Sequence, residues 1–185
     1  ASYRRQRQMC IRDRINTDGL IPTLEAVNHK LNTPIPLGYS NVGKVISIGS
    51  EVKNYQIGDR IVSNASHAEI VSTQKNLSAK IPDNVSDETA SFTVIASIAM
   101  HGVRLANVAI GETVAVVGSG LIGLLTIQIL KANGCNVIAY DFDKEKLMLA
   151  EKFGAQSFLL NKEGSGENFA LNQTNNVGAV SYTHL

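Results

Sequence analysis

The sequence predicts an α/β protein in which a strand-rich part precedes the first half of a doubly wound parallel sheet. Short β-rich runs separated by turns fill residues 37–77. Apolar, β-branched runs then alternate with helical patterns over residues 113–160, as strand–helix–strand units do. A glycine-spaced turn lies where the first of these runs passes into a helical pattern, at residues 118–123. Together these patterns favour two sheets of different kinds in one chain.

The composition is that of an ordinary globular chain. Of its 185 residues, 44% are hydrophobic and 18% are charged, which excludes a disordered chain and a collagen-like repeat. Two cysteines are too few for a disulfide scaffold and suit a reducing compartment, so we expect a cytoplasmic protein. The opening residues lack the apolar core of a secretory leader, and we expect none.

The two ends of the chain differ from the rest. Residues 1–14 contain five arginines against one acid, a net charge of +4, whereas the remaining residues carry 12 basic and 15 acidic side chains. A mildly acidic body argues against a nucleic-acid partner. Residues 1–14 and 180–185 resemble read-through from sequencing adapters, so we expect a non-native head and tail around an internal fragment, residues 15–179. The alternative for the head is a basic nucleic-acid or targeting arm.

A short helix is expected near the start of this fragment. Pro22 suits a first helical turn, and Leu24, Val27 and Leu31 fall on one face at helical spacing. The prolines within residues 33–36 then end the helix.

Short strands with turns between them follow the helix. We expect strands over residues 42–49 and 68–72, and a turn that leads into a strand over residues 57–62. This spacing favours a small barrel or sandwich. Ser86 or Asp87 is then positioned to cap a helix rich in alanine, isoleucine and valine.

Strands and helices alternate in the second half of the chain. We expect strands over residues 113–118, 136–141 and 157–160, and helices over residues 121–134 and 144–155. The glycines within the long uncharged stretch divide it into a strand, a turn and a helix, so we expect no membrane span. Further partners of the first strand would lie downstream of the fragment, so we expect its other edge to be unpaired.

The turn after the first parallel strand has the spacing G-x-G-x-x-G. Gly118 allows a tight turn, Gly120 lets the backbone approach a pyrophosphate, and Gly123 lets the helix pack against the strand. The phosphates of a dinucleotide would lie at the positive end of that helix. The alternative is a glycine-rich packing turn without a ligand.

An acidic residue ends the next strand. Asp141 lies eighteen residues after Gly123, where the acid of a dinucleotide fingerprint is expected. Its carboxylate can accept hydrogen bonds from an adenosine ribose and would repel a 2′-phosphate, which favours NAD over NADP as the cofactor; the alternative is a solvated acid at a strand end. We therefore predict a cofactor-binding set that consists of Gly118, Ser119, Gly120, Leu121, Ile122, Gly123 and Asp141.

Three stretches of this chain resemble the medium-chain dehydrogenase/reductase superfamily, whose members are zinc-type alcohol dehydrogenase-like. They are GYSNVGKVISIGSEVKNYQIGDRIV, KIPDNVSDETASF and AIGETVAVVGSGLIGLLTIQILKANGCNVIAYDFDKEKLMLAEKFGA. The resemblance implies that residues 15–92 are the later part of a GroES-like catalytic domain. It implies that residues 93–179 are the first half of a Rossmann NAD-binding domain, and that a small-molecule substrate exchanges a hydride with the cofactor between the domains.

The chain departs from this family at its zinc positions. Zinc-dependent members carry Gly-His-Glu where this chain has Gly38, Tyr39 and Ser40, and many carry a third ligand where it has Thr93. These side chains do not suit a tetrahedral zinc site. The comparison implies a zinc-independent member with no metal site.

Two residues are candidates for a catalytic role. The hydroxyl of Tyr39 can donate a proton to a carbonyl substrate. Ser97 matches a family position, usually threonine, that contacts the nicotinamide. For both residues, a role in packing is the alternative.

The stretch from residue 15 to residue 45 is similar to a narrower group. These are bacterial two-part oxidoreductases, in which such a dehydrogenase precedes a glucose–fructose-oxidoreductase-like domain. The similarity implies a sugar or nucleotide-sugar substrate in surface polysaccharide synthesis, a fused second domain and, in the full-length protein, an oligomer. The main hypothesis is thus an NAD-dependent oxidoreductase. The alternative is a catalytically silent NAD-binding scaffold or sensor.

Overall fold

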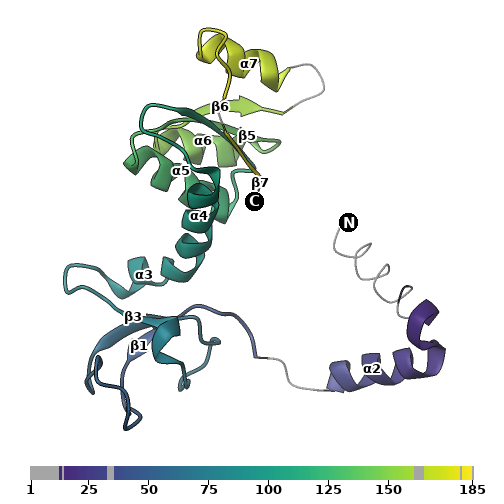
Figure 1. Cartoon of the computed structure of the whole chain (residues 1–185), viewed down its shortest axis with the longest axis vertical. Helices are drawn as coiled ribbons and strands as arrows, with labels where there is room; N and C mark the ends of the chain where they lie inside the picture. The colour runs from purple at the N-terminus through teal and green to yellow at the C-terminus, as the bar shows by residue number, and fades with distance from the viewer. Residues whose placement is uncertain (1–12, 14, 33–35, 161–164, 180, 185) are drawn as a thin grey trace. The chain divides into compact units, whose positions relative to one another are not determined.

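The computed structural model describes residues 13, 15–32, 36–160, 165–179 and 181–184. The chain divides into two compact units, Ala1–Gly38 and Tyr39–Leu185. The first unit contains helix α2, Leu20–Asn32, which confirms the expected helix (Figure 1). Pro22 lies in its first turn, and the hydroxyl of buried Thr23 donates to the carbonyl of Gly19 at 2.7 Å. Proline is tolerated there because a first-turn N–H has no partner within the helix.

The second unit begins with a small antiparallel sheet. In the described part of the chain its strands are β1, Asn41–Lys44, β2, Arg60–Ser63, and β3, Ser78–Lys80, in the order β1-β2-β3. The 3-10 turn η1, Lys75–Leu77, leads into β3. Side chains of the sheet pack against the helices that follow it, in a cluster of Val62, Ile81 and Ala90 with Val42, Val85 and Val94.

The first expected strand is shorter than the sequence pattern predicted. β1 ends at Lys44, and the prediction to residue 49 is wrong. Val45 donates its N–H to the carbonyl of Asp59 at 2.9 Å and accepts from the N–H of Gly58 at 2.8 Å. Gly58 has φ +94°, so the segment that leads into β2 turns at this point. It therefore provides no further backbone hydrogen bonds that would extend β1.

The strand predicted over residues 68–72 is absent, and that prediction is also wrong. Ile70, which the strand would have buried, is 71% exposed. The side-chain amide of Asn41 donates to the carbonyls of Ser66 and Ala68, at 3.2 and 3.4 Å. A side chain thus takes backbone acceptors next to β1 that a strand ladder would have used.

Two helices stand where the sequence pattern predicted one. Ser86 caps the short helix α3, Asp87–Ala90, by accepting from the N–H of Thr89 at 3.2 Å, as expected. The longer helix α4, Thr93–Ala106, follows after a break of two residues. Arg60 joins the antiparallel sheet to α3, because its guanidinium donates to Oδ1 of Asp87 at 2.6 Å and to the carbonyl of Val85 at 2.8 Å.

The alternating pattern of the second half forms the expected parallel sheet. Among the described residues, four strands lie in the order β6-β5-β4-β7, and every neighbouring pair is parallel. The elements are β4 (Thr113–Val117), α5 (Leu121–Ala132), β5 (Asn136–Asp141), α6 (Lys144–Lys152), β6 (Gln156–Leu159), α7 (Gly166–Gln173) and β7 (Ser181–His184). Gly134 and Gly154, with φ +79° and +87°, follow the ends of α5 and α6.

The outer edge of β4 is paired, which corrects the expectation that it is bare. β7 runs parallel to β4 with Val114 opposite Ser181 and Val117 opposite His184. The unpaired N–H and C=O groups of a central strand form a template for any extended segment within reach. Residues 181–184 take that place, although the sequence pattern alone gave no reason to put a strand there.

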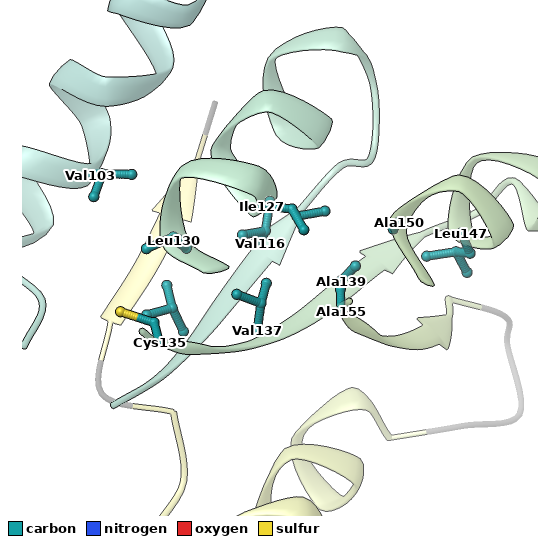
Figure 2. Close-up of a cluster of buried hydrophobic side chains, with 11 residues drawn as sticks. Val103, Val116, Ile127, Leu130, Cys135, Val137, Ala139, Leu147, Ala150 and Ala155 are labelled. Carbon is teal, nitrogen blue, oxygen red and sulfur yellow. The ribbon is translucent and has the colours of Figure 1, made fainter. Parts of the chain in front are cut away.

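Both faces of the parallel sheet are covered. Alternate residues of a strand point to opposite faces, and accordingly Val114 and Val116 of β4 belong to one buried cluster and Ala115 to another. Figure 2 shows the first cluster, in which Ile127 of α5 lies beside Val116. Ala170 of α7 packs in the second. A sheet buried on both faces explains why its strands are nearly continuous apolar runs.

None of the helices in the described ranges combines the length and the apolar character that a bilayer crossing requires.

Removing the centre of the first cluster should destabilise this sheet. Ile127 is fully buried, so we expect Ile127→Ala to lower the free energy of unfolding by roughly 2–5 kcal/mol. Ile110 is 83% exposed, and Ile110→Ala should change it by less than about 0.5 kcal/mol. Denaturant unfolding of the two variants measures both values. Equal effects would contradict the packing described here.

Candidate functional site

The turn between β4 and α5 brings two backbones into direct contact. Gly118 has φ +97°, a conformation that side-chain-bearing residues rarely adopt. A Cβ on Gly123 would lie 1.9 Å from the carbonyl oxygen of Gly118. The first turn of α5 therefore packs against the chain that leaves β4 only because both positions are glycine, as the sequence pattern predicted.

Gly120 faces open space. A Cβ at this position would meet no atom within 4 Å, and the backbone has φ −75°, which any residue adopts. Packing therefore does not require glycine here, whereas the close approach of a ligand to the backbone would. Within the described residues, no side-chain hydrogen bond caps the N-terminus of α5, so its first N–H groups remain available to an anion. This combination fits the pyrophosphate of a dinucleotide.

Asp141 stands at the end of β5 and reaches back to this turn. Its Oδ2 accepts the N–H of Ser119 at 2.7 Å, and its Oδ1 accepts the N–H of Asp143 at 2.9 Å. Burial tends to raise the pKa of Asp141, but these two hydrogen bonds and the nearby charge of Lys146 outweigh it and lower the pKa. The carboxylate is therefore negatively charged at neutral pH.

The other predicted cofactor residues differ in exposure. Leu121 is 49% exposed at the start of α5, and Ile122 is half-buried. Ser119 is fully buried: its N–H is bonded to Asp141, and its hydroxyl has no hydrogen-bond partner within the described residues. Structure and sequence together bring Gly118, Gly120, Gly123 and Asp141 to one turn. Ser119 lies in the same turn, with its side chain buried.

Sequence reasoning did not assign a role to the start of α6. Asp143 caps this helix, since its Oδ1 accepts the N–H of Glu145 at 2.9 Å. Its own N–H fixes one oxygen of Asp141. The Lys146 ammonium lies 3.8 Å from Oδ2 of Asp143, in an exposed pair. The aspartate spacing D-x-D before a helix was the available signal, because aspartate is a strong helix cap.

The positions that depart from the zinc pattern lie near the junction of α3 and α4. The hydroxyl of Ser40 donates to the carbonyl of Ser91 at 2.7 Å, two residues before Thr93 opens α4. Tyr39, directly before Ser40, is 54% exposed. No group of three or more His, Cys, Asp or Glu side chains positioned to hold a metal occurs in the described part of the chain.

Ser97 lies on an exposed part of α4. Its hydroxyl donates to the carbonyl of Val94 at 2.6 Å, one turn back along the same helix. The proton of this hydroxyl is thus engaged within α4, although the oxygen keeps the capacity to accept. Tyr39 and Ser97 stay predictions as catalytic residues.

Comparisons with known proteins give related sequences and folds, although no family model matches the chain. The (R,R)-butanediol dehydrogenase of Bacillus subtilis is 31% identical over 150 residues, which are 66% of this chain and 43% of that protein. The L-idonate 5-dehydrogenase of Vitis vinifera is 29% identical over 169 residues, 74% of this chain and 46% of that protein.

The solved structures agree with this relationship. The structure of a mycobacterial protein complexed with NADPH matches with a TM-score of 0.69 and 26% identity, over 82% of this chain and 50% of that one. The chain spans about half the length of the curated relatives it matches.

Two glycine substitutions should separate the packing role from the ligand role. Gly123→Ala places a methyl group on the carbonyl of Gly118, so we expect a loss of roughly 3 kcal/mol or more in the free energy of unfolding. Gly120→Ala meets no atom and should leave Tm unchanged while it weakens dinucleotide binding. Thermal unfolding and titration with NADH measure the two effects. A normal Tm for Gly123→Ala would refute the packing role.

Proposed function

Because the chain is related in sequence and fold to the medium-chain dehydrogenase/reductase superfamily, we propose that it is the nucleotide-binding part of an NAD-dependent oxidoreductase. The observation that carries the proposal is the turn at residues 118–123, which has open space at Gly120, uncapped N–H groups on α5 and the Asp141 carboxylate beside it. The named relatives act on a diol and on a polyhydroxy acid. We accordingly assign a small alcohol or carbonyl compound as the substrate.

The residues of the chain would bind and orient the cofactor. The first N–H groups of α5, with the positive end of its dipole, suit the pyrophosphate. Asp141 suits the adenosine ribose, because a carboxylate has about four lone-pair sites and the backbone N–H groups of Ser119, Asp143 and Phe142 use at most three of them. When bound, the cofactor supplies hydride transfer.

The charge of Asp141 supports NAD over NADP. A 2′-phosphate on the ribose would bring two negative groups together, and like charges at such a distance repel. The structural relative with NADPH shows that the fold itself accepts a 2′-phosphate, so the preference depends on local side chains. In this chain Lys146 already lies 3.8 Å from Asp143, in an ion pair beside the site.

Zinc independence is the second part of the proposal. The positions where zinc ligands are expected hold Tyr39, Ser40 and Thr93. The hydroxyl of Ser40 donates its hydrogen bond to the carbonyl of Ser91. Without a metal, polarisation of a substrate carbonyl needs a proton donor, and half-exposed Tyr39 is our candidate. A sugar or nucleotide-sugar substrate is the narrower proposal that follows from the resemblance of the stretch ending near residue 45.

A catalytically silent NAD-binding scaffold is the second candidate function. The engagement of the Ser97 hydroxyl within α4 favours it, since that proton is not offered to a ligand. Turnover of NADH by the full-length protein, with sugar-nucleotide and quinone acceptors, separates the two functions, because we expect the fragment alone to be inactive. Turnover that falls in Tyr39→Phe supports the oxidoreductase, whereas tight NADH binding without turnover, unchanged in Tyr39→Phe, supports the scaffold.

Asp141 should set the cofactor preference. We expect Asp141→Ser to lose roughly 1–3 kcal/mol of NAD binding, the scale of hydrogen bonds to a charged group, and to reduce discrimination against NADP. The lowered pKa keeps the carboxylate charged, so the affinity of the wild type for NAD, which has no 2′-phosphate, should be constant between about pH 5 and 8. Titration with both dinucleotides tests this. Equal affinity of the wild type for NAD and NADP would show that Asp141 does not discriminate.

The zinc positions should remain without metal in solution. We expect metal analysis of gently purified protein to give less than about 0.1 zinc per chain, because hydroxyl side chains are poor zinc ligands. Added chelator should leave Tm unchanged. About one zinc per chain would overturn the interpretation of Tyr39, Ser40 and Thr93.

A further inference from the structure

We propose that Asp141 is also a positioning residue for the phosphate-binding turn, which it holds through the N–H of Ser119. This inference rests on the proposed function, because the turn is the site assigned to the pyrophosphate. It gives Asp141 a role that does not require contact between its carboxylate and the ribose.

The contacts around Asp141 link three segments. Oδ2 accepts the N–H of Ser119 at 2.7 Å, between Gly118 and Gly120 of the turn. Oδ1 accepts the N–H of Asp143 at 2.9 Å, at the start of α6. One carboxylate at the end of β5 thus fixes both the β4–α5 turn and the β5–α6 turn.

The turn has few other means of holding this geometry. Ser119 is fully buried in the native chain, so the Asp141 carboxylate is the acceptor that keeps its N–H in place and protected from water. Its hydroxyl has no hydrogen-bond partner within the described residues, and so it supplies no second anchor. The glycines on both sides of Ser119 do not fix the turn either, because glycine allows the widest range of backbone dihedral angles. The neighbouring N–H of Gly118 does bond to the carbonyl of Tyr140, at 2.7 Å, so the strand end stays in place while Ser119 depends on Asp141.

Charge and geometry make opposite predictions for phosphate binding. If Asp141 only contacts the ribose, its removal takes a negative charge away from a phosphate site and should tighten the binding of a ligand without ribose hydroxyls. If Asp141 holds the turn, the same removal disorders the N–H groups that face the phosphates, and binding should weaken. The sign of the change distinguishes the two roles.

Amide hydrogen exchange of Ser119 tests the positioning role without any ligand. In the full chain we expect Asp141→Ala to accelerate exchange at Ser119 by roughly ten-fold or more, the equivalent of one hydrogen bond to a charged acceptor. Exchange in the interior of β4 should not change. Asp141→Asn keeps one oxygen for Ser119 and should restore most of the protection. Asp143→Ala, the matched control, removes the same charge but not the bond to Ser119, and should have no effect there.

Binding of 2′,3′-dideoxy-ADP provides the second measurement. The probe has the pyrophosphate but neither ribose hydroxyl, so we expect about ten-fold weaker binding to Asp141→Ala than to the wild type, with Asp141→Asn in between. Unchanged exchange at Ser119, or equal or tighter binding of this probe to Asp141→Ala, would overturn the inference.

If the wild type bound neither ADP nor NADH, the proposed function would fail, while the exchange of Ser119 would still decide whether Asp141 holds the turn. If Asp141→Ala did not fold, weaker binding of the probe to Asp141→Asn than to Asp143→Ala would support the inference, and equal or tighter binding would overturn it.

Discussion

Gly118 and Gly123 meet backbone to backbone, and the position of α5 on the parallel sheet depends on this contact. With a Cβ on Gly123 only 1.9 Å from the Gly118 carbonyl, no larger residue fits without moving the helix. The same approach places the first N–H groups of α5 at the carboxyl end of β4. Packing alone therefore requires glycine at positions 118 and 123, and the ends of β4 and β5 meet at the turn that results.

The parts of the fold that follow from local sequence were predicted well. β4, α5, β5 and α6 were foreseen from apolar periodicity and from glycines such as Gly134 and Gly154, because strand, turn and helix signals here lie within a few residues of one another. The failures concern pairing between distant segments. Residues 68–72 have strand-like character but lack a ladder, and residues 181–184 pair with β4 without an apolar pattern that predicts it. β propensity describes suitability for a sheet and not the identity of the partner.

The candidate site shows the same division. The glycines and Asp141 were assigned from spacing, and the structure brings them to one turn. The burial of Ser119 and the contact of its N–H with Asp141 were not predictable, because both depend on how β5 lies beside β4. Tyr39 and Ser97 were assigned from resemblance. The structure shows that the Tyr39 side chain is half-exposed and that the Ser97 hydroxyl donates a hydrogen bond within its own helix. Hydroxyl residues occur in so many packing roles that sequence alone does not single them out.

The strand order β6-β5-β4-β7 also implies an order of assembly. Val114 pairs with Val137 across 23 positions of the chain, but with Ser181 across 67 positions. Closing the longer loop costs about 1 kcal/mol more chain entropy, and the short four-residue ladder of β7 must offset it. The β4–β5–β6 core consequently has the lower contact order and can form before its last strand arrives. In the native state we expect the same difference to make β7 separate from β4 before β5 does, so that local unfolding on this side begins beside the β4–α5 turn and leaves the centre of the sheet intact.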